Sequence, residues 1–329
     1  MLTYIIRRVL YSIPVLFVST FLSFAFVSYA GDPLAALRQN PRIPKTTIDI
    51  IIHNNHLDQA IPIRYFGWLW GIITNGFGRS LYNSELLWPQ ITRTMGHTTQ
   101  VVLIAEAIAI VIGCAVGMYS AIRQYSFFDY SFTTLSFLGF AMPTFFLALL
   151  LQNLFVDQFN GSFGSWLQGQ RIFYTFGING PDQSDSWFTL DRLQHIALPV
   201  MTLATISFAL YSRYMRASML DVINSDYVRT ARAKGVPEWK VIVRHVVPNA
   251  LIPVVTVTAL NLGGVLGGAI ITETVFTLDG FGYWFLTALN NGDMYAVMSY
   301  LVITSVIIIV FNLVADVLYG VLDPRIRYE

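Results

Sequence analysis

The chain has 329 residues, of which 55% are hydrophobic and only 12% are charged. A soluble globular domain carries about 25% charged residues, so this composition favours a membrane protein. The net charge of +1 gives no reason to expect a nucleic-acid partner, and the single cysteine, Cys114, excludes an internal disulfide.

Six apolar stretches are long enough to cross a bilayer, which takes roughly 20 residues. They cover residues 9–29, 98–121, 131–156, 195–213, 250–274 and 296–319. The sequence therefore predicts an all-α integral membrane protein with six spans in a single domain, 1–329. The first stretch leaves a cleaved signal peptide as an alternative, because Arg7-Arg8 precede it, but its apolar run is longer than a signal core.

The distribution of basic residues predicts the orientation. Twelve of the 20 Lys and Arg residues fall in segments that would share a side with both termini, including the loop 214–249. The positive-inside rule places that side in the cytoplasm. Segments 31–97, 157–194 and 275–295 then lie outside, and Tyr65 to Ile73 within the first is typical of an interfacial helix, with Trp68 and Trp70 suited to a headgroup belt.

Residues for catalysis or nucleotide binding are not found. A phosphate-binding loop needs Gly, four residues, Gly-Lys and Ser or Thr, and at the only Lys before Ser or Thr, Lys45, Gln39 and Pro44 stand at the glycine positions. An ATPase that drives this protein must be another chain. No zinc-binding histidine pair and no Gly-x-Ser-x-Gly motif occurs, and His53 and His56 are more typical of a solvated helix face than of a metal site.

Polar residues within the apolar stretches are candidates for function, because burying them in hydrocarbon is costly. Glu106, Asn153 and Asn261 are our candidates for a translocation pathway. Interhelical hydrogen bonds are the alternative role for the amides. Asp316 has an ordinary explanation in pairing with Arg325 or Arg327. The glycine-rich run 261–268 indicates either close helix packing or a flexible pathway wall.

One basic segment, 226–250, interrupts this apolar chain. Within it, Lys234-Gly235-Val236-Pro237 combines a residue that tolerates positive φ with one that restricts φ, which predicts a short helix, a break and a second helix. A basic loop that attracts anionic lipid is the alternative interpretation.

This segment resembles the cytoplasmic loop of the membrane subunits of ABC importers, whose pattern is Glu-Ala-Ala, three residues, Gly, nine residues and Ile-x-Leu-Pro. Counting from Gly235 places Arg229-Thr230-Ala231 at the first three positions and Pro248 at the last. The spacing is kept, but Arg229 replaces the usual acid and puts the acid-mediated contact with the ATPase in doubt.

Over nearly its whole length the chain is similar to the B-type permease of the dipeptide/oligopeptide permease family. The matching pieces are Tyr4 to Arg8, Gly31 to Pro33, Leu57-Asp58 with Pro62, Phe77 to Ser80, Asp226 to Gly235, Gly268 to Phe276, Gly280 to Gly282 and Asp316 to Arg327. At Asn75-Gly76 and Leu278-Asp279 the residues differ from those usual in the family. We expect these positions to affect docking of the binding protein or the class of substrate.

The resemblance implies a type I ABC importer (MetI-like) permease fold and a non-catalytic subunit that pairs with a second permease, most simply as a heterodimer. Cytoplasmic ATPases would hold ATP and Mg, no cofactor would bind this chain, and an extracytoplasmic binding protein would deliver peptides in a bacterial or archaeal plasma membrane. Nickel, glutathione or sugar-derived substrates are alternatives, as is an ATP-independent transporter or channel.

The family's functional positions carry over onto two groups of residues. The coupling loop would comprise Arg229, Thr230, Ala231, Ala233, Gly235 and Pro248. The outer gate would comprise Glu273, Phe276, Gly280 and Gly282.

Overall fold

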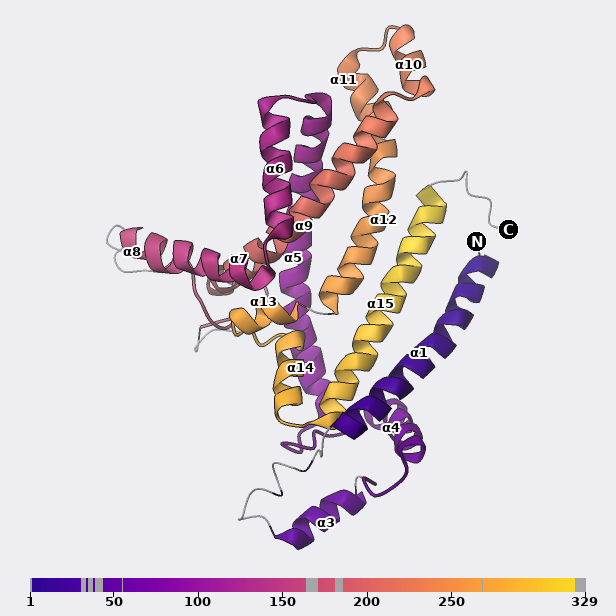
Figure 1. Cartoon of the computed structure of the whole chain (residues 1–329), viewed down its shortest axis with the longest axis vertical. Helices are drawn as coiled ribbons and strands as arrows, with labels where there is room; N and C mark the ends of the chain where they lie inside the picture. Colours follow the sequence, from indigo (N-terminus) through magenta and orange to yellow (C-terminus); the bar gives the residue numbers. More distant parts are fainter. Residues whose placement is uncertain are drawn as a thin grey trace.

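The structure is a computed structural model that describes residues 2–30, 34, 38, 44–54, 56–163, 171–180, 186–267 and 269–322. Long helices dominate it (Figure 1). Five of them in the described residues are long and apolar enough to cross a membrane, and a bent pair makes up to six.

The long helices are α1 (Leu2–Ala30), α5 (Leu87–Ile122), α9 (Leu190–Ile223), α12 (Val247–Leu266) and α15 (Met294–Leu322). The bent pair joins α6 (Phe127–Ala141) to α7 (Thr144–Leu151) and π-helical η1 (Gln152–Phe159), and the short helix α8 (Asn160–Phe163) follows it. At one end of the bundle lie α10 (Asp226–Ala233), α11 (Glu238–Val241) and π-helical η2 (Ile242–Val246). The remaining helices are α3 (Lys45–Asn54), α4 (Ile61–Asn75), α13 (Ile270–Val275) and α14 (Phe281–Asn290).

The third apolar stretch, 131–156, differs from the single straight span we expected. Its two helical parts meet at an angle of 108°. The break lies at Met142-Pro143, where Met142 adopts φ −78° and ψ 127°. A residue before proline avoids the helical region, and proline itself cannot donate the helical hydrogen bond. The proline therefore turns the chain although the composition stays apolar.

The fifth stretch, 250–274, is also divided. Helix α12 ends at Leu266, and Ile270–Val275 form the separate helix α13. Gly267 follows α12 directly, and a Cβ at this glycine would lie 2.7 Å from the side chain of Thr304 on α15. The glycine-rich run thus ends one helix while allowing close packing on another; Gly268 lies outside the described residues.

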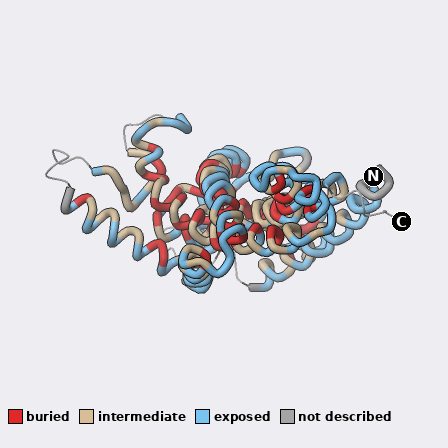
Figure 2. The backbone as a smooth tube through the Cα atoms, turned by 90° about the horizontal axis from the view of Figure 1, so that it is seen from above, coloured by how far each residue is buried: buried red, intermediate tan, exposed pale blue. Residues whose placement is uncertain are grey.

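Close helix contacts hold the centre of the bundle together. Helix α5 packs along α9, and a Cβ at Gly117 would come within 2.5 Å of the carbonyl oxygen of Ser212. Helix α12 packs on α15, where a Cβ at Gly263 would lie 2.8 Å from Phe311 Cβ. Figure 2 shows the buried residues along the middle of the bundle and exposed ones at its margins. Small residues at these positions let two backbones approach, as is usual between membrane helices.

The two ends of the bundle differ. The outer tips of α1 and α15, at residues 2 and 322, point toward the same end as the α10–α11 loop, while α3 and α4 lie at the opposite end (Figure 1). Apolar side chains such as Leu10, Val15 and Phe26 on α1 are exposed. An exposed apolar face of this length suits contact with lipid.

Candidate translocation and coupling sites

A buried acid joins three helices in the middle of the bundle. Helix α5 carries Glu106, which is 2% exposed. Ser207 of α9 donates to its carboxylate at 2.6 Å, and the hydroxyl of Tyr211, one turn further along α9, donates as well. Asn261 of α12 donates through Nδ2 at 3.0 Å. Three donors compensate the burial of a carboxylate, which is costly when unpaired.

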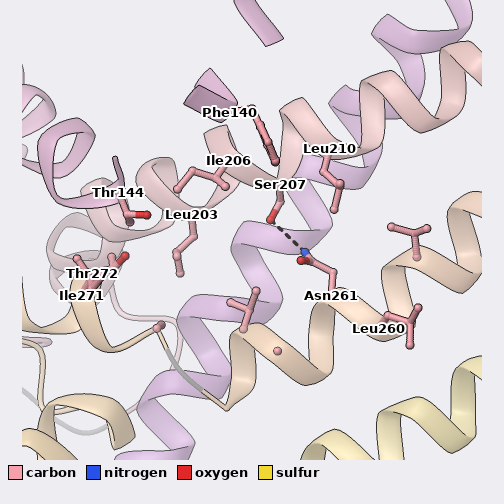
Figure 3. Close-up of a pocket in the computed structure, with 14 residues that line it drawn as sticks. Phe140, Thr144, Leu203, Ile206, Ser207, Leu210, Leu260, Asn261, Ile271 and Thr272 are labelled. Carbon is pink, nitrogen blue, oxygen red and sulfur yellow. Dashed lines mark hydrogen bonds between the residues drawn. The ribbon is translucent and has the colours of Figure 1, made fainter. Parts of the chain in front are cut away.

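A cavity of about 580 Å³ lies directly beside this cluster. Figure 3 shows Ser207 and Asn261 directed toward each other at its wall. Asn261 Nδ2 donates to Ser207 Oγ at 3.3 Å. The other polar residues of the cavity are Thr144 and Thr272. The rest of the lining is apolar or glycine: Phe140, Leu203, Ile206, Leu210, Val257, Leu260, Gly264, Val265, Ala269 and Ile271.

The three pathway candidates therefore occupy three different environments. Asn261 lines the cavity, while Glu106 is not among the lining residues and lies behind the wall, where it holds Asn261 and Ser207. Asn153 is exposed in η1 and accepts a hydrogen bond from Gln158 at 3.0 Å, outside the Glu106 cluster. The structure thus brings together two of the three. Ser207 and Tyr211 were missed because a serine and a tyrosine are ordinary in a span.

A second polar network lies toward the end that carries α3 and α4. The Glu273 carboxylate of α13 accepts from Thr98 Oγ1 at 2.5 Å and from the backbone N–H of Tyr283 at 2.9 Å. A Cβ at Gly280 would lie 2.3 Å from Glu273 Cδ, and one at Gly282 would lie 2.8 Å from Ile270 Cα. Three of the four outer-gate candidates are therefore in contact because the two glycines leave room for the acid.

Phe276, the fourth candidate, is 1% exposed and packs in the core. Its carbonyl oxygen accepts from the backbone N–H of Gly177 at 3.3 Å. This hydrogen bond connects the segment 171–180 to the end of α13.

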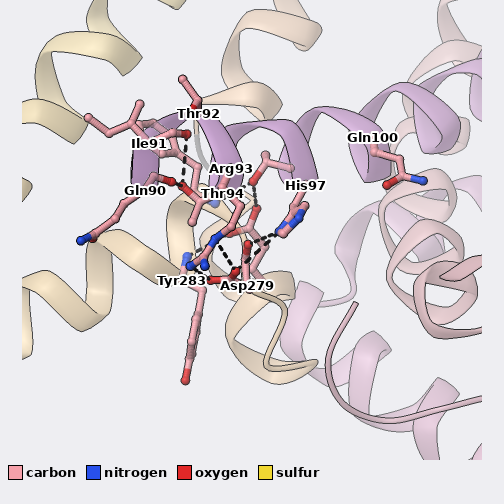
Figure 4. A network of polar contacts seen from close by, with 12 residues as sticks. Gln90, Ile91, Thr92, Arg93, Thr94, His97, Gln100, Asp279 and Tyr283 are labelled. Carbon is pink, nitrogen blue, oxygen red and sulfur yellow. Dashed lines mark hydrogen bonds and ion pairs between the residues drawn. The ribbon is translucent and has the colours of Figure 1, made fainter. Parts of the chain in front are cut away.

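Residues near the start of α5 extend this network. Figure 4 shows Arg93 and His97 directed at Asp279, in the connection between α13 and α14. Arg93 Nε lies 3.1 Å from Asp279 Oδ2, and His97 Nδ1 lies 2.7 Å from the carbonyl oxygen of Asp279. Arg93 and His97 are four residues apart, which places them on one helix face. This spacing could have marked them as a pair of neighbouring basic residues, but it does not indicate that Asp279 is their partner.

The loop between α9 and α12 has the break that the sequence predicts. Helix α10 ends at Ala233, and Gly235 has φ +75°, the left-handed region that favours glycine. Its N–H donates to the carbonyl oxygen of Arg232 at 2.9 Å. Pro237 then precedes α11.

An ion pair bridges that break. Arg232 Nη2 lies 2.7 Å from Glu238 Oε1, and Arg232 Nε donates to both carboxylate oxygens. The hydrogen bond that Arg232 donates to the Glu238 carboxylate raises the pKa of the guanidinium above its usual value, which favours the charged form. The bridge holds α10 and α11 in one arrangement.

The six coupling-loop candidates divide into a buried anchor and an exposed surface. Ala231 is 7% exposed and packs in the core with Val228 and Val241. The exposed candidates are Arg229, Thr230, Ala233, Gly235 and Pro248. Pro248 lies in the first turn of α12 and not in the loop. Arg229 Nη1 lies 3.8 Å from Asp226 Oδ1 in an exposed ion pair, so the Arg229 charge is open to a partner.

Asp316 pairs with Arg8 of α1 among the described residues, and its expected pairing with Arg325 or Arg327 stays a prediction. Its Oδ2 lies 2.7 Å from Arg8 Nε on α1, an ion pair that joins α1 to α15. Arg325 and Arg327 lie outside the described residues, as does Gly31 to Pro33. In the part of the chain that the structure describes, no group of three or more His, Cys, Asp or Glu could hold a metal ion.

Comparison with known proteins places these features in a family. The profile of the binding-protein-dependent transport system inner membrane component matches residues 109–328, and the profile of the N-terminal part of such membrane components matches residues 1–104. The chain belongs to the binding-protein-dependent transport system inner membrane components. These are permease subunits of ABC transporters with the MetI-like fold, and the chain is accordingly a multi-pass membrane protein that works with partner subunits.

Curated members of this permease family are similar over their full length. The oligopeptide transport system permease protein AppB of Bacillus subtilis is 36% identical over 335 residues, which covers 100% of both chains. The oligopeptide transport system permease protein OppB of Mycobacterium tuberculosis is 34% identical over 332 residues, 99% of each chain. The di/tripeptide transport system permease protein DppB of Pseudomonas aeruginosa is 33% identical over 341 residues, 100% of each.

Proposed function

We propose that the chain forms, with a second homologous permease subunit, the pathway through which peptides enter the cell in an ATP-driven importer. Its relatives are named as oligopeptide and di/tripeptide permeases, which supports a peptide substrate. The cavity supports a pathway role, because it combines an apolar wall with a few polar groups from α9 and α12. The subunit itself is non-catalytic, and ATP is hydrolysed on partner chains.

The observation that carries this proposal is the continuity between the loop and the cavity wall. Residues Glu238–Leu266 form one helical unit that begins in the loop and carries Asn261 to the cavity. Helix α9 precedes the loop in the chain and carries Ser207, which also lines the cavity. A displacement of α10 and α11 therefore moves two helices of the wall together.

The exposed side of α10 and α11 is where cytoplasmic ATPases would bind. Arg229, Trp239 and Lys240 are exposed there, while Val228 and Val241 anchor the loop to the bundle. Closure of the ATPases would push on a unit that the Arg232–Glu238 ion pair stiffens. Both termini then lie in the cytoplasm, and α3, α4 and the α13–α14 connection face the binding protein outside a bacterial or archaeal plasma membrane.

Copurification from the native membrane tests this assignment. The tagged chain, solubilised in mild detergent, is analysed by mass spectrometry for bound subunits, and the binding protein recovered with it is analysed for its ligand. We expect a second permease, at least one ABC ATPase and a peptide. A chain that transports peptide alone, with no ATPase, would contradict the proposal, and a nickel, glutathione or sugar-derived ligand would overturn the substrate class only.

A further inference from the structure

A basic groove lies at the end of the bundle away from the coupling loop, between α4 and the chain that leads into α5. Its volume is about 500 Å³. Arg64, Arg79 and His56 line it together with the amides of Gln59 and Asn75, and none of its described lining residues is an acid. A cationic groove without acids is complementary to an anionic ligand.

The charge of Arg64 is not neutralised within the described residues. Arg64 Nη2 donates to the thioether sulfur of Met294 at 3.3 Å, and its guanidinium lies 5.8 Å from the ring centroid of Phe24. Arg64 Nε is buried and has no hydrogen-bond partner among the residues that the structure describes. Asp293, the acid next to Met294 in the sequence, accepts hydrogen bonds from the Ser80 hydroxyl and from the backbone N–H of Leu81. The half-buried guanidinium of Arg64 therefore contacts a thioether and an aromatic ring, and its positive charge favours binding of an anion.

A second unpaired donor lines the same groove. Trp68 is 8% exposed, and its indole Nε1 is buried without a hydrogen-bond partner in the described part of the chain. Buried indole N–H groups usually find an acceptor. Trp68 and Arg64 lie one turn apart on α4, and both residues line the same groove.

The position of the groove indicates the source of the anion. Helix α4 packs on the half of α1 that is remote from the coupling loop, where Tyr65 bonds Thr20 at 2.8 Å and Trp68 packs on Phe24. Phe66 and Trp70 on α4 are 56% and 67% exposed, as aromatic residues at a membrane boundary are. The groove opens by α4 and Tyr295, whereas the cavity beside Asn261 is lined from α6, α7, α9, α12 and α13.

We propose that this groove binds the phosphate of an anionic phospholipid from the leaflet opposite the coupling loop. Arg64 and Arg79 would pair with the phosphate, and the exposed aromatic residues of α4 would pack on the acyl chains. A peptide is a poorer fit, because its amine would find no acid in the groove. The inference depends on membrane insertion and is independent of the substrate and of the ATPase.

Native mass spectrometry of the full chain in detergent tests it, with dioleoylphosphatidylglycerol as the probe. We expect Arg64→Gln and Arg79→Gln each to raise the apparent dissociation constant about fivefold, as expected for one basic residue near a charged lipid surface. Arg171→Gln is the matched control, because Arg171 is exposed and lines no part of the groove. Dioleoylphosphatidylcholine should bind more weakly than the anionic lipid.

Arg79→Gln keeps the test valid if Arg64→Gln accumulates poorly, since Arg79 is exposed and its side chain donates to the carbonyl oxygen of Ser84 at the surface. Equal binding by the wild type, both groove variants and the control would overturn the proposal. So would trialanine binding that requires Arg64 and Arg79 while phosphatidylglycerol binding does not.

Discussion

Asn261 on α12 donates a hydrogen bond to the carboxylate of Glu106 on α5 over 3.0 Å. This contact links a residue of the cavity wall to an acid that is itself buried behind the wall. Ser207 bonds to both, so α5, α9 and α12 meet at one polar point in an otherwise apolar bundle. Interhelical polar contacts of this kind fix the register of membrane helices.

Replacing Asn261 by Leu should lower peptide uptake severalfold and destabilise the protein by about 1–3 kcal/mol, because Glu106 loses one of its donors while it stays buried. Uptake in cells and the melting temperature of purified protein measure the two effects. Asn153→Leu is the matched control, since Asn153 is exposed and outside the cluster. Equal losses in the two variants would refute a special role for Asn261.

Glu106→Gln should also destabilise the protein by about 1–3 kcal/mol, because an amide offers one acceptor oxygen where three donors now meet a carboxylate. The loss should be smaller when Asn261 is already Leu, since the two residues share one network. Thermal unfolding of both single variants and the double variant measures the coupling. Strict additivity would show that the contact carries no energy.

Gly282→Ala and Gly96→Ala should shift stability in opposite directions. A Cβ at Gly282 would meet the backbone of Ile270 at 2.8 Å, so overpacking should cost about 1–3 kcal/mol. A Cβ at Gly96 meets nothing within 4 Å, and alanine should gain up to about 1 kcal/mol from helix propensity. The melting temperatures of both variants and of the wild type in detergent measure these changes in stability. A Gly282→Ala protein as stable as the wild type would mean that α13 and α14 are packed less closely than the structure shows.

Arg216→Ala should destabilise the protein by about 3–5 kcal/mol, because Asp129, which is 2% exposed, would lose a two-bond partner at 2.7 and 2.8 Å. Arg123→Ala removes the same charge from an exposed position at the end of α5 and should change stability little. Chemical or thermal unfolding distinguishes the two. Similar midpoints for both variants would exclude a structural role for the ion pair.

The positions of the helices were largely predictable, because roughly 20 apolar residues have few other stable environments. The bend at Met142-Pro143 was missed because apolar composition continues across it, although the proline itself was a visible signal. The split between α12 and α13 was missed for a similar reason: glycines that favour packing also end helices.

Within the candidate sites, the sequence indicated which residues are unusual better than it indicated which residues they contact. A lone glutamate in an apolar stretch identified Glu106, but its partners on α9 and α12 are more than 100 positions away, and the rotation of each helix is set by packing. Gly235 was predictable because its role is local: the break needs a positive φ. Ala231 was assigned to the coupling loop by the resemblance, and that its side chain packs in the core could not be predicted from the spacing.

The central claim is that motion of the α10–α11 loop drives peptide transport, and uptake by the reconstituted complex tests it most directly. Radiolabelled peptide uptake into proteoliposomes is measured with ATP or with a non-hydrolysable analogue, for wild type and for Gly235→Pro. Proline cannot adopt φ +75° and removes the N–H that bonds Arg232, so the loop should be distorted while the membrane helices insert normally. We predict uptake only with ATP and only in the wild type, at equal amounts of inserted protein. Normal uptake by Gly235→Pro, or uptake without ATP hydrolysis, would contradict the account.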